Sequence, residues 1–79
     1  MSEISERAHQ ASRLLDDPTL QKAFEGVRQS MLAALEAASV GDRETHHEIA
    51  LSLQALKAVK RQLERWVQDG EVEKARSNV

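Results

Sequence analysis

Apolar residues recur at intervals of three and four along most of this chain, which is the period of one face of an α-helix. A first series, between Pro18 and about Ser39, consists of Leu20, Phe24, Val27, Met31 and Leu35. A second series, between Arg43 and Gln68, consists of Ile49, Leu53, Leu56, Val59, Leu63 and Trp66. Alternating steps of four and three are typical of a seam that packs against another helix. The pattern therefore predicts two long amphipathic helices.

Local signals predict where the first of these helices begins. Asp17 is a favoured N-cap, and Pro18 suits the first turn, where its missing N–H would have had no partner. A residue that precedes proline is pushed out of the α region, so a helix over Glu3–Leu15 should end near Asp16. We therefore expect a short leading helix joined to the long one.

Two glycines bracket the second long helix. In "SVGD", residues 39–42, Gly41 is able to take a positive φ and Asp42 is suited to capping the next helix. Gly70 follows the last periodic residues and predicts the end of that helix, with residues 70–79 as a frayed polar tail. A tight turn at residues 39–42 would make the two long helices an antiparallel hairpin.

Such a hairpin predicts which apolar residues meet. Three pairs are expected: Leu35 with Ile49, Met31 with Leu53, and Phe24 with Val59. Five further apolar residues lie off this seam and need another cover: Leu14, Leu15, Leu32, Leu51 and Val67. We therefore predict an all-α fold, in which a short N-terminal helical segment precedes a long antiparallel helical hairpin and the hairpins form an oligomeric bundle. The alternative is a monomeric three-helix mini-bundle closed by the leading segment.

Composition adds a reason to expect association. The chain has 79 residues and no cysteine. A domain this small is hard to stabilise without a staple or a partner, and neither a disulfide nor a thiolate metal site is available to it. We treat residues 1–79 as a single domain, with a leading segment at 1–16, the hairpin at 17–69 and the tail at 70–79.

Net charge and hydropathy indicate which classes of partner the protein is expected to bind. The formal net charge is −2, which gives no global attraction for nucleic acid. No apolar run approaches the roughly 20 residues that cross a bilayer. We therefore expect a cytoplasmic protein whose partners do not include a membrane.

The most specific local feature is a group of four cations on the second long helix: Lys57, Lys60, Arg61 and Arg65. Spacing of i, i+4 and i+8 aligns Lys57, Arg61 and Arg65 on one helix face. Such a stripe is a candidate for holding phosphates by charge-assisted contacts. The competing interpretation is a solvated face whose long side chains shield the seam.

The segment "RETHHEI", residues 43–49, collects potential metal ligands. Neighbouring residues on a helix point about 100° apart, so His46 and His47 do not face one ion easily. A zinc-binding helix would instead carry two histidines four residues apart. We predict no metal site here. His46 lies three residues before Ile49 and is expected to extend the seam, where its protonation would make assembly sensitive to mild acid.

The sequence contains no recognisable catalytic motif. The chain lacks a cysteine nucleophile and a glycine-rich phosphate loop, and no elbow motif surrounds its serines. We therefore predict a non-enzymatic protein without a cofactor.

Trp66 has two interpretations. It is either an interface anchor or stacking platform beside Arg65, or it closes the open end of the hairpin by packing near Leu20 and on the leading segment.

Three phrases, "ASRLLDDPTLQKAF", "RETHHEIALSLQALKAVKRQLE" and "DGEVEKA", resemble small helical proteins encoded by tailed bacteriophages and prophages among their head and packaging genes. The resemblance spans roughly residues 8–75. It implies a phage-encoded accessory or virion-assembly protein, homo-oligomeric, with no catalytic residues to carry over.

Two narrower phage families share features with the chain. Small terminase subunits also use helical hairpins to form rings, but they normally add a helix-turn-helix segment, and residues 1–16 are too short for one. Phage proteins that sequester cyclic nucleotides share the short leading segment and the long hairpin. Their aromatic, asparagine-rich stretch is replaced here by "ALKAVKRQLERW".

Taken together, these features favour a homo-oligomer that acts in assembly through contacts with itself and with another protein. The expected interface residues are Leu20, Phe24, Met31, Ile49, Leu53, Leu56, Val59, Leu63 and Trp66. The alternative is an oligomeric module that binds nucleotide or DNA phosphates through the four cations.

Overall fold

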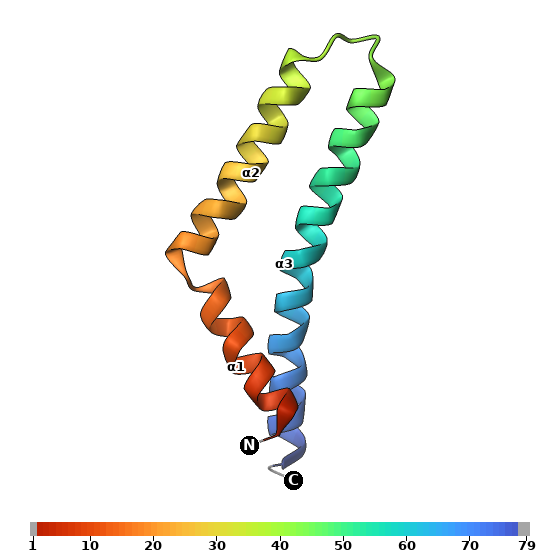
Figure 1. Ribbon diagram of the computed structural model, residues 1–79. Coiled ribbons are helices and arrows are strands. Elements are labelled where there is room, and N and C mark those ends of the chain that lie inside the picture. The colour runs from red at the N-terminus through yellow and green to blue at the C-terminus, as the bar shows by residue number, and fades with distance from the viewer. Residues whose placement is uncertain (1, 78–79) are drawn as a thin grey trace.

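The computed structural model describes residues 2–77 and is all-α. Its elements in chain order are α1 (Glu3–Leu15), α2 (Pro18–Ala37) and α3 (Arg43–Ser77). Figure 1 shows α1 and α2 following one another along the same side of α3. The predicted short leading helix and two longer helices are thus confirmed.

Side-chain caps explain where α1 and α2 begin. The Ser2 hydroxyl accepts a hydrogen bond from the Ser5 backbone N–H at 3.1 Å. Asp17 accepts two backbone hydrogen bonds with one carboxylate oxygen, from Thr19 at 2.8 Å and from Leu20 at 3.0 Å. With the proline in the first turn of α2, these bonds satisfy donors that a helix start leaves open. The expected joint between α1 and α2 is confirmed.

The turn between α2 and α3 is also held by a cap. Asp42 accepts the Thr45 backbone N–H at 3.1 Å and the Thr45 hydroxyl at 2.7 Å. The hydroxyl bond is the largest cause of a lowered pKa of the Asp42 carboxyl, and the backbone bond is the next. Within the described chain no residue has a positive φ, so Gly41 does not use the left-handed region that its identity allowed.

The prediction that Gly70 ends the last helix is wrong, because α3 continues through it to Ser77. The reason lies in α1, which crosses α3 at this level. A Cβ added at Gly70 would overlap the Cβ of Ala8. Gly70 therefore permits a close helix crossing and does not act as a stop. Residues 70–77 are helical rather than a frayed tail, and residues 78–79 lie outside the described chain.

The three helices do not form a three-layered bundle. α1 packs extensively on the C-terminal half of α3, α2 packs on its N-terminal half, and α1 and α2 scarcely touch. Each level of α3 therefore has one neighbouring helix (Figure 1). The result is a ribbon two helices wide, with extents of 58 × 23 × 15 Å. The alternative of a mini-bundle closed by the leading segment is not what the chain adopts.

The interior is correspondingly small. Among the described residues, the buried apolar side chains are Ala11, Ile49 and Leu63. Val59, predicted to meet Phe24 in the seam, is 55% exposed. Leu56 faces α2, and the three residues from Leu56 to Val59 turn the helix by about 300°, which is about 60° short of a full turn. The Val59 side chain therefore lies at the margin of the seam. The ribbon leaves much apolar surface in contact with solvent.

Candidate interaction surfaces

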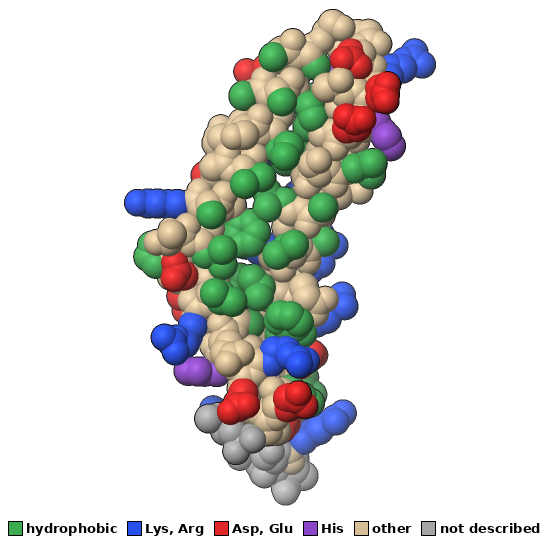
Figure 2. Space-filling view, viewed as in Figure 1, with side chains coloured by type: hydrophobic (Ala, Val, Ile, Leu, Met, Phe, Trp, Pro, Cys, Tyr) green, Lys and Arg blue, Asp and Glu red, His purple; other side chains and the backbone are tan. Residues whose placement is uncertain are grey.

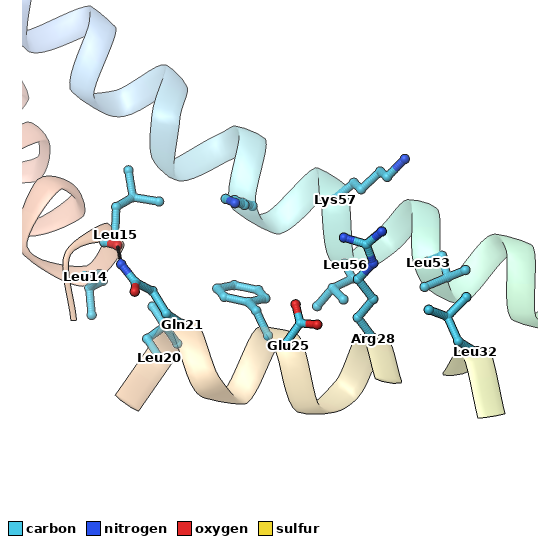
Figure 3. Close-up of a pocket in the computed structure, with 12 residues that line it drawn as sticks. Leu14, Leu15, Leu20, Gln21, Glu25, Arg28, Leu32, Leu53, Leu56 and Lys57 are labelled. Carbon is cyan, nitrogen blue, oxygen red and sulfur yellow. Dashed lines mark hydrogen bonds between the residues drawn. The ribbon is translucent and has the colours of Figure 1, made fainter. Parts of the chain in front are cut away.

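An apolar groove follows the line where the α1–α2 joint and α2 lie against α3. It encloses about 590 Å³. Figure 3 looks into it, with the side chains of α2 and α3 converging from opposite sides. Its lining is Leu14, Leu15, Leu20, Gln21, Phe24, Glu25, Arg28, Leu32, Leu53, Leu56, Lys57 and Lys60.

Helical spacing explains why these residues share one groove. On α2, Gln21, Arg28 and Leu32 fall on the same side of Phe24, which points toward α3. On α3, Lys57 and Lys60 fall on the same side of the seam. Because α2 and α3 are antiparallel, these two sides lie on one surface of the ribbon. We call this surface the groove face.

The wall of the groove at the joint is fixed by a hydrogen bond. The Gln21 side-chain Nε2 donates to the Leu15 backbone oxygen at 2.8 Å. This bond ties the start of α2 to the last residue of α1, which presents Leu14 and Leu15 to the groove. The position of α1 therefore helps to shape the groove.

The rim of the groove face is predominantly basic. Arg28 comes from α2, and Lys57 and Lys60 come from α3. All three are exposed, and Glu25 is the acidic residue among the lining side chains. Cations from two helices therefore border one apolar floor.

The four predicted phosphate-binding cations do not all share this rim. Lys57 and Lys60 line the groove, whereas Arg61 lines a more open hollow on α3, and Lys57 lies between the two and lines both. Arg65 lies one turn beyond Arg61 on the same side of α3 and is also exposed. The structure thus divides the predicted basic stripe between two surfaces.

The opposite surface of the ribbon has a different character. Val27 and Val59, 43% and 55% exposed, do not line the groove. Figure 2 shows this surface, with hydrophobic side chains along the middle of the ribbon, acidic side chains over the start of α3 and charged side chains across the lower end. The ribbon therefore has two unlike faces.

α1 packs closely on the C-terminal half of α3. Leu63 is 8% exposed and Ala11 is 1% exposed. The Arg7 guanidinium carbon lies 5.4 Å from the centroid of the Trp66 ring, within the range of a cation–π contact. Trp66 therefore contacts the leading helix, which is one part of the interpretation that it closes the hairpin, while its packing near Leu20 stays a prediction. Together with the Ala8–Gly70 crossing, this contact holds α1 on α3.

The structure distributes the expected interface residues over three environments. Ile49 and Leu63 are buried, Val59 is exposed, and the others are partly exposed. Within the partly exposed group, four line the groove: Leu20, Phe24, Leu53 and Leu56. The remaining two, Met31 and Trp66, do not line it.

The histidine-rich start of α3 forms no ligand cluster. Among the described residues, no group of three histidine, cysteine or acidic side chains is arranged to hold a metal ion. His46 is partly buried, and its Nε2 atom has no hydrogen-bond partner within that part of the chain. The expected extension of the seam by His46 stays a prediction, with Ile49 buried three residues further along the same helix.

Sequence reasoning missed the groove as a unit. Leu14, Leu15 and Leu32 stood out only as apolar residues without a cover, although the groove unites them with Phe24. The sequence did contain a signal for two different faces, because the α2 positions on one side of Phe24 include charged residues and those on the other side do not. The contribution of α1 had no such signal, since it depends on where α1 crosses α3.

None of the helices over residues 2–77 is long and apolar enough to span a membrane. Comparison of the chain with protein-family models, with curated proteins and with solved structures finds no match.

Proposed function

We propose that the protein is a non-enzymatic interaction protein, which associates with copies of itself and acts in assembly through protein–protein contacts. It would be of the type that tailed phages encode and that its phrases resemble. The observation that carries this proposal is the ribbon architecture, in which each level of α3 has one helical neighbour. Stable domains normally bury their apolar faces between at least two layers.

The surface area gives this observation a magnitude. The accessible area of the chain is 6463 Å². A compact monomer of 8.8 kDa would expose about 4,800 Å². The difference, roughly 1,700 Å², is about twice the 800 Å² that each partner loses in a standard protein interface. The ribbon therefore has enough surplus surface for a stable interface with a second copy.

The shape agrees with the area. The radius of gyration is 17.3 Å. A compact domain of this length would have a radius near 12 Å. An elongated shape with few buried side chains is expected for a subunit whose core is completed by association.

The experiment for this proposal is native mass spectrometry of the full chain together with sedimentation equilibrium over a range of concentrations. We expect a dimer or a larger closed oligomer at micromolar concentration. A monomer that keeps its helicity throughout that range would overturn the proposal, because the ribbon would then be stable without a cover.

A second candidate function is binding of a phosphate-bearing ligand at the groove face. The observation that favours it is the convergence of Arg28 from α2 with Lys57 and Lys60 from α3 around one apolar floor. A nucleotide combines an apolar base with anionic phosphates, and its affinity for such a rim should fall as salt rises.

This candidate has its own test. Binding of a cyclic dinucleotide and of short duplex DNA can be measured by calorimetry at low and moderate salt. Replacing Arg28, Lys57 and Lys60 by Gln should abolish binding, whereas the matched replacement of Arg61 and Arg65 should leave it intact. Equal affinity in both variants would remove the groove from consideration as the phosphate site.

A further inference from the structure

The two faces of the ribbon differ in charge, and the difference follows from helical position. On α2, with Phe24 directed at α3, Arg28 lies about 40° to the groove side and Val27 about 60° to the opposite side. On α3, with Leu56 directed at α2, Lys60 lies about 40° to the groove side and Val59 about 60° to the opposite side. The charged side chains therefore project on one face and the two valines on the other.

The second face continues in the same register along both helices. Its positions are spaced four, three and four residues apart on α2 and three, four and three apart on α3, which is the spacing of a helix-packing seam. The eight positions of this middle stretch are exposed and uncharged: Ala23, Val27, Ser30, Ala34, Ser52, Ala55, Val59 and Gln62. On α3 the stretch ends at the exposed Glu48, which lies four residues before Ser52. We call this surface the uncharged face.

We propose that a second copy of the chain packs on the uncharged face, so that α2 and α3 of two copies form a four-helix arrangement. This inference rests on the proposed self-association and assigns the face that carries it. The groove faces of the two copies then point outward and remain open to another partner.

The area available is consistent with this arrangement. A standard interface covers about 800 Å² of each partner, and the chain exposes roughly 1,700 Å² more than a compact monomer would. One covered face therefore accounts for about half of the surplus surface. The remaining half is consistent with a groove face that stays exposed.

Charge distinguishes the two faces as sites for self-association. In any pairing of two groove faces, each copy contributes Arg28, Lys57 and Lys60, with Glu25 as the acidic lining residue. Like charges brought together oppose association. Pairing of two uncharged faces brings no charged residue together over their middle stretch, although Glu48 lies at the end of the face on α3. Most of the side chains there are Ala, Ser or Val, which allow helices to approach closely. Self-association is therefore favoured on the uncharged face.

Two charge-matched double variants and one single variant test this assignment. In the first, Val27→Glu and Val59→Glu are combined on the uncharged face. In the control, Leu51→Glu and Val72→Glu are combined, because these residues are 50% and 53% exposed and lie on the outer side of α3. Leu32→Glu marks the groove face. Each protein is examined by sedimentation equilibrium, with circular dichroism to verify its helicity.

The expected result is that the first variant becomes monomeric while the control and Leu32→Glu remain associated. If Leu32→Glu dissociates and the first variant does not, the face is wrong although self-association stands. Dissociation of the control as well would also overturn the assignment, because added charge alone would then explain the loss. A monomeric wild-type chain would instead remove the proposed self-association itself.

A second measurement avoids dependence on glutamate variants that fail to fold. Because the chain contains no cysteine, Val59→Cys and Val72→Cys each introduce a single thiol. As protein concentration rises, a maleimide should modify Val59→Cys several-fold more slowly, while its rate with Val72→Cys should not change. Equal rates for the two positions at every concentration would overturn the assignment.

Discussion

The close crossing of α1 and α3 makes an unusual prediction for Gly70. In the interior of an exposed helix, replacing glycine by alanine normally stabilises a protein, by about 1 kcal/mol in helix propensity. At Gly70 the added methyl group would overlap the Cβ of Ala8, an atom that moves only with the α1 backbone. Gly70→Ala should therefore force the two helices apart.

The two effects can be compared. Inserting a methyl group into a packed contact costs typically 1–3 kcal/mol, so the overlap outweighs the propensity gain of about 1 kcal/mol. We expect Gly70→Ala to lower the free energy of unfolding by about 1 kcal/mol. Gly26 provides a matched control, because it also lies within a helix and a Cβ added there would meet nothing within 4 Å. Gly26→Ala should raise the free energy of unfolding by about 0.5–1 kcal/mol.

Urea unfolding followed by circular dichroism measures both changes. All proteins must be compared at one concentration, because self-association would stabilise each by mass action. Adding Ala8→Gly to Gly70→Ala transfers the methyl group to the other helix and should recover part of the loss. If Gly70→Ala stabilised the protein as much as Gly26→Ala, the crossing of α1 over α3 would not be as the structure shows it.

Three further predictions concern helix ends and the α1–α3 contact. Asp17→Ala should lower the free energy of unfolding by about 1 kcal/mol in urea titrations, and Asp17→Asn should retain most of it, because asparagine is an equally good N-cap. The pKa of the Asp42 carboxyl is lowered from its ordinary value of 3.8, chiefly by the Thr45 hydroxyl bond. The stabilisation that the Asp42 carboxylate provides is therefore present above that pH and is lost as pH falls through the lowered pKa. The free energy of unfolding of Asp42→Asn should accordingly change less steeply with pH below about pH 4 than that of the wild type. A curve as steep as that of the wild type would exclude this role for Asp42. Arg7→Gln should lower the free energy of unfolding by about 0.5 kcal/mol and change the fluorescence of Trp66, whereas an unchanged spectrum would count against their contact.

Features encoded locally were predictable from the sequence. Asp17 and Asp42 cap α2 and α3 because a short carboxylate reaches a backbone N–H two or three residues ahead. Pro18 fixes the α1–α2 joint through its own geometry. The existence and order of the three helices and the starts of α2 and α3 therefore followed from nearby residues.

Features that depend on a distant partner were not predictable in the same way. Gly70 follows a periodic stretch, as a helix-ending glycine does, and only the position of Ala8 shows that it serves a close crossing. Val59 continues the alternating spacing of the seam, yet it is 55% exposed because it lies about 60° around α3 from Leu56, at the margin of the contact with α2. Both errors came from reading a one-dimensional pattern where three-dimensional packing decides.

The crossing at Gly70 also bears on the groove at the other end of α1. The last turn of α1 supplies Leu14 and Leu15 to the groove wall, and Leu15 accepts the hydrogen bond from Gln21. α1 is a single helix of 13 residues, so a displacement where Ala8 meets Gly70 is carried to Leu15 two turns away. Hydrogen exchange of Gly70→Ala should therefore show faster exchange in α1 and around the joint, while the exchange of the distal part of the α2–α3 hairpin stays unchanged. A partner that binds the groove would consequently bind Gly70→Ala more weakly without touching residue 70, which would show that docking of α1 preorganises the groove.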